Sequence, residues 1–257
     1  MSGHSKWSTI KRKKAVTDAR RGNIFTQIIK EITVAAKLGG GDPNSNARLR
    51  FAIEKAKTNN MPADNIKRAI QKGTGELPGV NYEDAIYEAY GPGGVALIIE
   101  TVTDNKNRTI SDIRHILERN HGKVAISGSV AFQFHKKGII AVPKSVIPED
   151  DLLSIILDAG ADDLKTEGDE YSIICMPDHF ETVRHALAAK SIKIESAEIL
   201  LVADNTVKVE GKDAENLLKL MEILEEDEDV QKVHANFDID DKELARIGSG
   251  VTPLMNS

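Results

Sequence analysis

Cysteine and long apolar runs are scarce in this 257-residue chain. Its one cysteine, Cys175, cannot form an internal disulfide framework, and the thiolate clusters that structural zinc prefers are missing. The longest apolar runs, such as 95–99 and 199–203, span five or six residues, whereas a membrane-spanning helix needs about 20. No apolar stretch follows the basic N-terminus, so we expect no secretory signal. These absences predict a cytoplasmic protein without a membrane partner.

The net charge of −6 hides an uneven distribution of charge along the chain. Residues 1–75 carry 16 Lys and Arg against 5 Asp and Glu, which gives +11. The other 182 residues carry 18 against 35, which gives −17. Such asymmetry indicates that the basic end meets a nucleic acid or another acidic surface. A solvated helical face is the plainer alternative, but a charge this high opposes compaction unless a partner neutralises it.

The basic end is predicted to be helical. Apolar residues recur every three or four positions over 18–38 and 45–57, and a third helix opens at Pro62 and ends at Gly73. Three helices behind a basic arm predict a nucleic-acid-binding domain over residues 1–79. The second and third helices, about four residues apart, also resemble a helix-turn-helix, although many three-helix bundles share this spacing.

The rest of the chain alternates strands and helices. Residues 136–205 read as strand, helix, strand, strand, helix, strand, which predicts a ferredoxin-like unit. The predicted fold class is α+β, in which a three-helix domain precedes two ferredoxin-like domains and the third domain (136–205) is inserted in the second (80–135 plus 206–240). Strands at 130–135 and 207–209 would be the middle strands of the second domain. Residues 241–257 would form a flexible tail.

Lysine and arginine at this density neutralise phosphates and release counterions, which drives binding that does not depend on base sequence. The candidate phosphate contacts lie on the arm and on the predicted solvent faces of the helices. They are Lys6, Lys11, Arg12, Lys13, Lys14, Arg20, Arg21, Arg48, Arg50, Lys55, Lys57, Lys67, Arg68 and Lys72. The single tryptophan, Trp7, could stack on a base or fasten the arm to the helices.

Two further segments each allow two interpretations. Backbone N–H groups near Asn107, with the Arg108 side chain, could hold a phosphate at a predicted helix start. The alternative is a helix N-cap at Asn105 beside a solvated arginine. The acidic run 225–229 is either a solvated face or a docking surface for the chain's own basic domain.

No pattern for catalysis or metal binding emerges. The seven histidines lack the spacing of metal ligands, and Cys175 lies in an apolar strand, as a buried thiol would. The glycine-rich loop 91–94 lacks the Gly-Lys-Ser/Thr ending of a nucleotide-binding loop and predicts a tight turn. We therefore expect no catalytic residue, no metal and no cofactor. The competing classes are an enzyme acting on RNA or a nucleotide, and a plain protein-interaction scaffold.

Short motifs spread over nearly the whole chain resemble the YebC/PmpR family. They include GHSKW at 3–7, NMP at 60–62, NRT at 107–109 and GSV at 128–130, in the family's order. The resemblance implies a three-domain α+β fold. It also implies a role in gene expression, because members are named probable transcriptional regulators that bind DNA. A mitochondrial relative is named a translational activator of cytochrome c oxidase, and members have been assigned to ribosomes stalled on proline-rich stretches.

These observations predict a non-enzymatic, monomeric regulator that binds DNA or ribosomal RNA. Both targets present phosphate, so charge alone does not choose between transcriptional and ribosome-bound translational control. Two points favour the ribosome slightly. The sequence shows no dimer element, although symmetric operators usually call for dimers, and two acidic modules beside one basic module suit a spanning adaptor.

Overall fold

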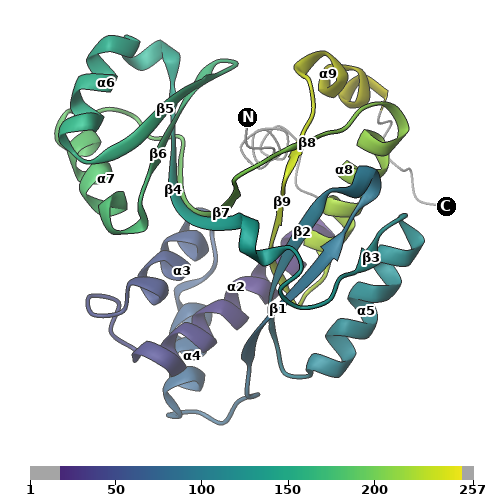
Figure 1. Ribbon diagram of the computed structural model, residues 1–257. Coiled ribbons are helices and arrows are strands. Elements are labelled where there is room, and N and C mark those ends of the chain that lie inside the picture. Colours follow the sequence, from purple (N-terminus) through teal and green to yellow (C-terminus); the bar gives the residue numbers. More distant parts are fainter. Residues whose placement is uncertain (1–17, 251–257) are drawn as a thin grey trace.

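The computed structural model describes residues 18–250, and its N-terminal part is helical as expected (Figure 1). Helix α2 (Asp18–Gly39) packs against α3 (Ala47–Thr58) and α4 (Ala63–Thr74). The apolar stripe of α2 at Ile28 and Ile32 meets Leu49 of α3 and Ala69 of α4 in a common core. Gly73 allows α4 to lie close to α2, because a Cβ there would collide with the Thr33 carbonyl oxygen.

The next unit is a four-stranded antiparallel sheet. Its strands are β1 (Glu83–Tyr90), β2 (Ala96–Thr103), β3 (Lys123–Val124) and β9 (Val230–Ala235), in the order β3-β1-β2-β9. Helices α5 (Lys106–Arg119) and α8 (Gly211–Glu226) cover one face and enclose the largest apolar core. The glycine-rich loop forms the tight turn that the sequence predicts, a single 3-10 turn (Pro92–Gly94) with positive φ at Gly93 and Gly94.

The remaining four long strands form a second antiparallel sheet with the predicted order of elements. These are β4 (Phe134–Pro143), α6 (Glu149–Asp158), β5 (Ala161–Glu167), β6 (Glu170–Cys175), α7 (Phe180–Ala189) and β7 (Ser196–Ala203). The sheet order β5-β6-β4-β7 is that of a ferredoxin-like unit. Its first and last strands pair antiparallel from Phe134–Ala203 to Ala141–Ser196, so the chain enters and leaves at neighbouring points.

The predicted strands of the second unit are wrong in two places. Residues 130–135 are not a middle strand of this sheet: residues Ala131–Gln133 form a 3-10 turn, and β4 begins at Phe134 in the other sheet. The turn forms because the Glu88 carboxylate accepts backbone N–H bonds from Val130 and Ala131, which a ladder strand would use for pairing. Residues 207–209 contribute only the short β8 (Val207–Lys208), which pairs parallel with β10 (Phe237–Asp238).

Strand β1 and the C-terminal residues also differ from the sequence-based prediction. The strand Glu83–Tyr90 was not expected, because its three acidic residues mask the alternation of buried positions. Residues 241–250 form helix α9 (Asp241–Gly250), and its Ile247 is buried in the core under α8, so this part is not a frayed tail. No helix in the described part of the chain is long and apolar enough to cross a membrane.

The helical part contacts both sheets. Figure 1 shows α3 beside α7, and the ring of Phe51 on α3 meets Phe180 of α7 edge-on at 6.1 Å between centroids. Helix α2 packs across β2 and β9, on the sheet face opposite α5 and α8. The two sheets also touch, since Phe134 and Val130 pack with Ala96 and Ile98 of β2. These three contacts hold α3 and α4 in a fixed position at one side of the molecule.

Candidate nucleic-acid interface

The exposed face of α4 carries the densest group of uncommitted cations among the described residues. Ile66 and Ala69 are buried in the helical core, whereas Lys67, Arg68 and Lys72 point to solvent. The spacing of 67, 68 and 72 places all three on one side of the helix. Their side chains form no hydrogen bond or salt bridge with any residue that the structure describes. This side of α4 is therefore a solvated basic stripe, available to an anionic partner.

Helix α3 precedes α4 in a helix-turn-helix order, with residues 59–62 between them. Asn60 adopts a positive φ of 56°, and the Met61 N–H bonds back to the Ala56 carbonyl. Met61 is itself buried in the helical core. The turn is therefore held from inside, and it fixes α4 relative to α3. Lys55 and Lys57 are exposed at the end of α3, next to this turn.

Arg48, a predicted phosphate contact, is committed to other residues. Its guanidinium donates to Glu31 on α2 at 2.7 and 2.9 Å and to Asp84 on β1 at 2.7 and 2.8 Å. The hydrogen bond from Arg48 lowers the pKa of Asp84 more than burial raises it. Both bidentate pairs tie α3 to α2 and to the first sheet. Arg48 therefore has a structural role in place of the predicted one.

Of the other predicted arginines before α4, one is partly engaged, one is exposed and one has a side chain that the structure does not describe. Arg50 donates to the Pro43 carbonyl at 3.1 Å and lies over the Phe51 ring, so it is half-buried and partly engaged. Arg21 is exposed near the start of α2. The side chain of Arg20 lies outside the described residues. So do the predicted contacts of the arm, which are Lys6, Trp7, Lys11, Arg12, Lys13 and Lys14.

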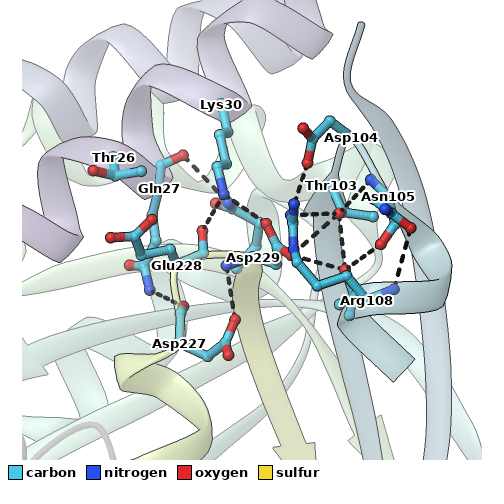
Figure 2. Close-up of polar contacts among 12 residues, drawn as sticks. Thr26, Gln27, Lys30, Thr103, Asp104, Asn105, Arg108, Asp227, Glu228 and Asp229 are labelled. Atoms are coloured by element: carbon cyan, nitrogen blue, oxygen red, sulfur yellow. Dashed lines mark hydrogen bonds and ion pairs between the residues drawn. The ribbon is translucent and has the colours of Figure 1, made fainter. Parts of the chain in front are cut away.

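The acidic run 225–229 docks the chain's own helical domain, which was the second of its two interpretations. Gln27 of α2 donates to the carbonyls of Glu225 and Asp227, both at 2.9 Å. Lys30 of α2 bonds the Glu228 carbonyl at 3.1 Å and the Asp229 carboxylate at 2.6 Å (Figure 2). The last carbonyls of α8 thus receive donors from α2, which compensates the negative end of the helix.

Asp229 lies at the centre of this contact between α2 and residues 225–229, here called the junction. Its Oδ2 accepts from Thr109 at 2.7 Å. The same Oδ2 accepts from Arg108 at 3.0 Å, while Oδ1 faces Lys30 (Figure 2). Burial raises the pKa of Asp229, but the hydrogen bonds from Lys30, Thr109 and Arg108 outweigh burial and bring it down to about 2. The carboxylate is therefore ionised at neutral pH and joins α2, α5 and β9.

The start of α5 is an N-cap, which was the alternative to a phosphate site. The Asn105 side chain accepts the backbone N–H groups of Asn107 and Arg108, both at 3.1 Å. These two N–H groups are therefore occupied. Arg108 is not simply solvated, because it pairs with Asp104 at 2.7 Å as well as with Asp229. Asn107 and Arg108 thus serve the junction and the cap.

A cavity of about 450 Å³ opens beside the junction. Five carboxylates line it against two cations, Lys30 and Arg108, and both cations are already paired. Its walls repel phosphate, so it is not the nucleic-acid site. Among the residues described, no group of three His, Cys, Asp or Glu side chains could hold a metal ion. Cys175 is buried as predicted, and burial raises the pKa of its thiol to about 11.

Sequence reasoning missed Lys30, Gln27 and Glu88, which hold the molecule together. No local signal marked the first two, because helix geometry places Gln27 and Lys30 off the apolar stripe of Ile28 and Ile32, where polar residues are expected. That face of α2 is buried only because the first sheet and the residues 225–229 pack against it. No local signal marks Glu88, since its partners lie about 40 residues away.

Two family models match the chain. The model described as the TACO1/YebC protein N-terminal domain matches residues 5–76, and the one described as the TACO1/YebC second and third domain matches residues 82–237. A probable transcriptional regulatory protein of Pelotomaculum thermopropionicum is 56% identical over 243 residues, which is 94% of this chain and 100% of the relative. One from Geobacter sp. (strain M21) is 54% identical over 96% of this chain and 100% of its own length.

A solved structure agrees with these matches. The crystal structure of a conserved hypothetical protein from Aquifex aeolicus superimposes with a TM-score of 0.79 at 43% sequence identity. The superposition covers 89% of this chain and 95% of the other. The chain has both matched parts in the same order, with the helical unit first and the two sheets after it, and on this evidence it belongs to the TACO1/YebC family.

Proposed function

We propose that this protein is a non-enzymatic regulator of gene expression that binds nucleic acid through the exposed face of α4. The observation that carries the proposal is the group Lys67, Arg68 and Lys72, which are exposed together and unpaired with any described residue. Each can meet a phosphate and release a counterion. The basic arm before α2, with Arg21 at the start of the helix, would add further contacts.

The first candidate for the target is duplex DNA in transcriptional control. Close relatives are named probable transcriptional regulatory proteins. The order of α3, turn and α4 suits a helix that enters the major groove. Gln71 lies between the cations, and its amide, which donates to Glu76 at 3.5 Å here, would have to turn from Glu76 to read a base edge. In this arrangement α3 would cross the phosphate backbone.

The second candidate is a ribosome-associated role in translation. One observation favours it: the helical part and the two sheets touch each other at three places, which gives one body with a basic side. A rigid body of this kind suits a site on a large ribonucleoprotein particle. The A-form helices of ribosomal RNA would offer phosphates to the same α4 stripe.

Sedimentation of a cell lysate through a sucrose gradient tests both candidates. Migration with ribosomal particles that is lost after ribonuclease treatment is expected for the translational role. Recovery with DNA that is lost only after deoxyribonuclease treatment is expected for the transcriptional role. A variant with Lys67, Arg68 and Lys72 changed to Ala should stay at the top of the gradient. Wild-type protein that stays at the top in every sample contradicts the proposal.

A further inference from the structure

The loop 125–133, between β3 and β4, exposes two large apolar side chains. Phe132 is 74% exposed and Ile126 is 84% exposed, the highest values for large hydrophobic residues in the described part of the chain. Single exposed hydrophobic residues are common on soluble proteins. This pair differs from such residues because it stands on a loop that the rest of the molecule holds in place.

The Glu88 carboxylate fixes the middle of this loop. It accepts the backbone N–H groups of Gly128, Val130 and Ala131, the last two at 2.7 and 2.9 Å. Burial raises the pKa of Glu88, but these donated bonds outweigh burial and leave the pKa below its ordinary value. The charged carboxylate is therefore kept inside the loop, and Gly128 takes the positive φ of 84° that the turn requires.

The end of the loop is fastened as well. Gln133 accepts a bond from the Asn236 side chain at 3.1 Å, and its carbonyl accepts the Asp204 N–H at 2.9 Å. Val130 and Phe134, on either side of Phe132, are buried against β2. Phe132 therefore stands out from a loop with fixed residues before and after it. A backbone held in this way loses little conformational freedom when the exposed ring binds a partner.

The sequence on either side of the loop is basic, which favours an anionic partner. Residues 119–148 contain five Lys and Arg and no Asp or Glu, although the chain after residue 75 carries a net charge of −17. Arg119, Lys123 and Lys136 are exposed, and none of the three forms a salt bridge with a described residue. The Lys123 ammonium lies 5.9 Å from the centre of the Tyr90 ring, and Lys136 lines a small pocket with Glu100, so Arg119 is the least engaged of the three. An apolar protein surface would not require these cations, whereas a nucleotide chain presents both phosphates and flat bases.

We propose that the loop 125–133 binds unpaired nucleotides, with Phe132 stacked on a base and Arg119, Lys123 and Lys136 toward the phosphates. The proposal rests on the proposed function, because it assumes a nucleic-acid partner. It adds a second contact, distinct from α4. Bases stacked inside a duplex offer no free face to Phe132, so the loop selects single-stranded or looped segments, while α4 meets the phosphates of a duplex.

A fluorescence titration of the full chain tests the loop directly. The probe is a short single-stranded RNA with 2-aminopurine at its centre, and a duplex DNA of the same length is titrated in parallel. Phe132→Ala should weaken single-strand binding about 5- to 100-fold and reduce the quenching of 2-aminopurine. Phe132→Tyr should bind as the wild type does, because it keeps the ring. Duplex binding should be unchanged in both variants.

Two control variants separate base stacking from a general loss of apolar surface. Leu157→Ala removes another exposed apolar side chain, on α6, and should leave both affinities unchanged. Phe132→Leu keeps apolar area without a π-face and should bind nearly as weakly as Phe132→Ala. Single-strand affinity equal to that of the wild type in Phe132→Leu or Phe132→Ala overturns the stacking proposal. So does sedimentation that shows the wild type as a dimer and Phe132→Ala as a monomer, because the loop would then bind a second copy of the chain. If the duplex binds but single-strand binding does not depend on Phe132, only this inference is wrong. If neither the single-stranded RNA nor the duplex DNA binds, the proposed function is wrong too.

Discussion

Lys30 on α2 and Asp229, immediately before β9, form an ion pair of 2.6 Å, with side chains only 8% and 7% exposed. The two residues are 199 positions apart in the chain. Thr109 and Arg108 complete the hydrogen bonds of the carboxylate. A buried pair with its remaining oxygen satisfied is the arrangement in which removal of one partner is most costly. This pair therefore holds the basic helical part against the first sheet.

Asp229→Ala should lower the free energy of unfolding by about 3–5 kcal/mol, because Lys30 would stay buried without its partner. Chemical denaturation measures the change. Lys106→Ala, which breaks the exposed pair with Glu83, is the matched control and should behave as the wild type does. The double change Lys30→Met with Asp229→Leu should recover much of the loss, since no charge is left buried. A wild-type denaturation curve for Asp229→Ala would show that the pair does not hold the two parts together.

The same pair predicts how stability depends on pH. The folded pKa of Asp229 is about 2, below the ordinary value of 3.8. The unfolded chain therefore takes up the proton first as the pH falls, and the stabilisation, fully present above about pH 5, is lost between about pH 4 and 2. The wild type should lose about 2 kcal/mol more than Asp229→Asn across this window. Urea denaturation of both proteins at several pH values measures the difference. An equal loss of stability in the two proteins would contradict this prediction.

Arg48→Ala should separate structural from binding arginines. It removes the bonds to Glu31 and Asp84, so the free energy of unfolding should fall by about 1–2 kcal/mol. The salt dependence of nucleic-acid binding should stay unchanged, because four of the five guanidinium N–H groups already donate to Glu31 and Asp84. Arg68→Ala should reduce the salt dependence of binding and leave the free energy of unfolding unchanged. A reduced salt dependence in Arg48→Ala would place Arg48 in the interface after all.

The inserted sheet can be tested by excision. Lys136 and Leu201 are direct antiparallel partners at the start of β4 and the end of β7. Replacing residues 137–200 by Asn-Gly would join them through a two-residue hairpin turn. We expect the shortened chain to unfold in one cooperative transition and to keep duplex binding, since α4 is untouched. Loss of cooperative unfolding would show that the two sheets and α3 share a single core through Phe51 and Phe134.

The sequence predicts those parts of the fold that local periodicity determines. The three helices and the strand-helix order of residues 134–203 follow from spacings of two, three and four residues. Strand β1 escaped prediction because Glu83, Asp84 and Glu88 make it read as polar, and Glu88 is buried only through its bonds to the later loop.

The candidate interface also contains residues whose exposure local periodicity predicts and residues whose pairing it does not predict. Lys67, Arg68 and Lys72 are exposed as helix periodicity predicts. Arg48 and Arg108 are not free, because their carboxylate partners come from elements far along the chain. Charge density marks where cations are plentiful, but only the tertiary structure shows which cations are already paired.

The salt dependence of duplex binding tests the account most directly. The logarithm of the affinity of the wild type should fall linearly with the logarithm of the salt concentration. Changing Lys67, Arg68 and Lys72 to Ala should flatten this slope by about 2.7, at roughly 0.9 for each phosphate contact. A control with Lys165, Lys193 and Lys208 changed to Ala removes the same charge elsewhere and should keep the wild-type slope. Equal slopes for the α4 variant and the wild type would contradict the assignment of α4 as the nucleic-acid interface.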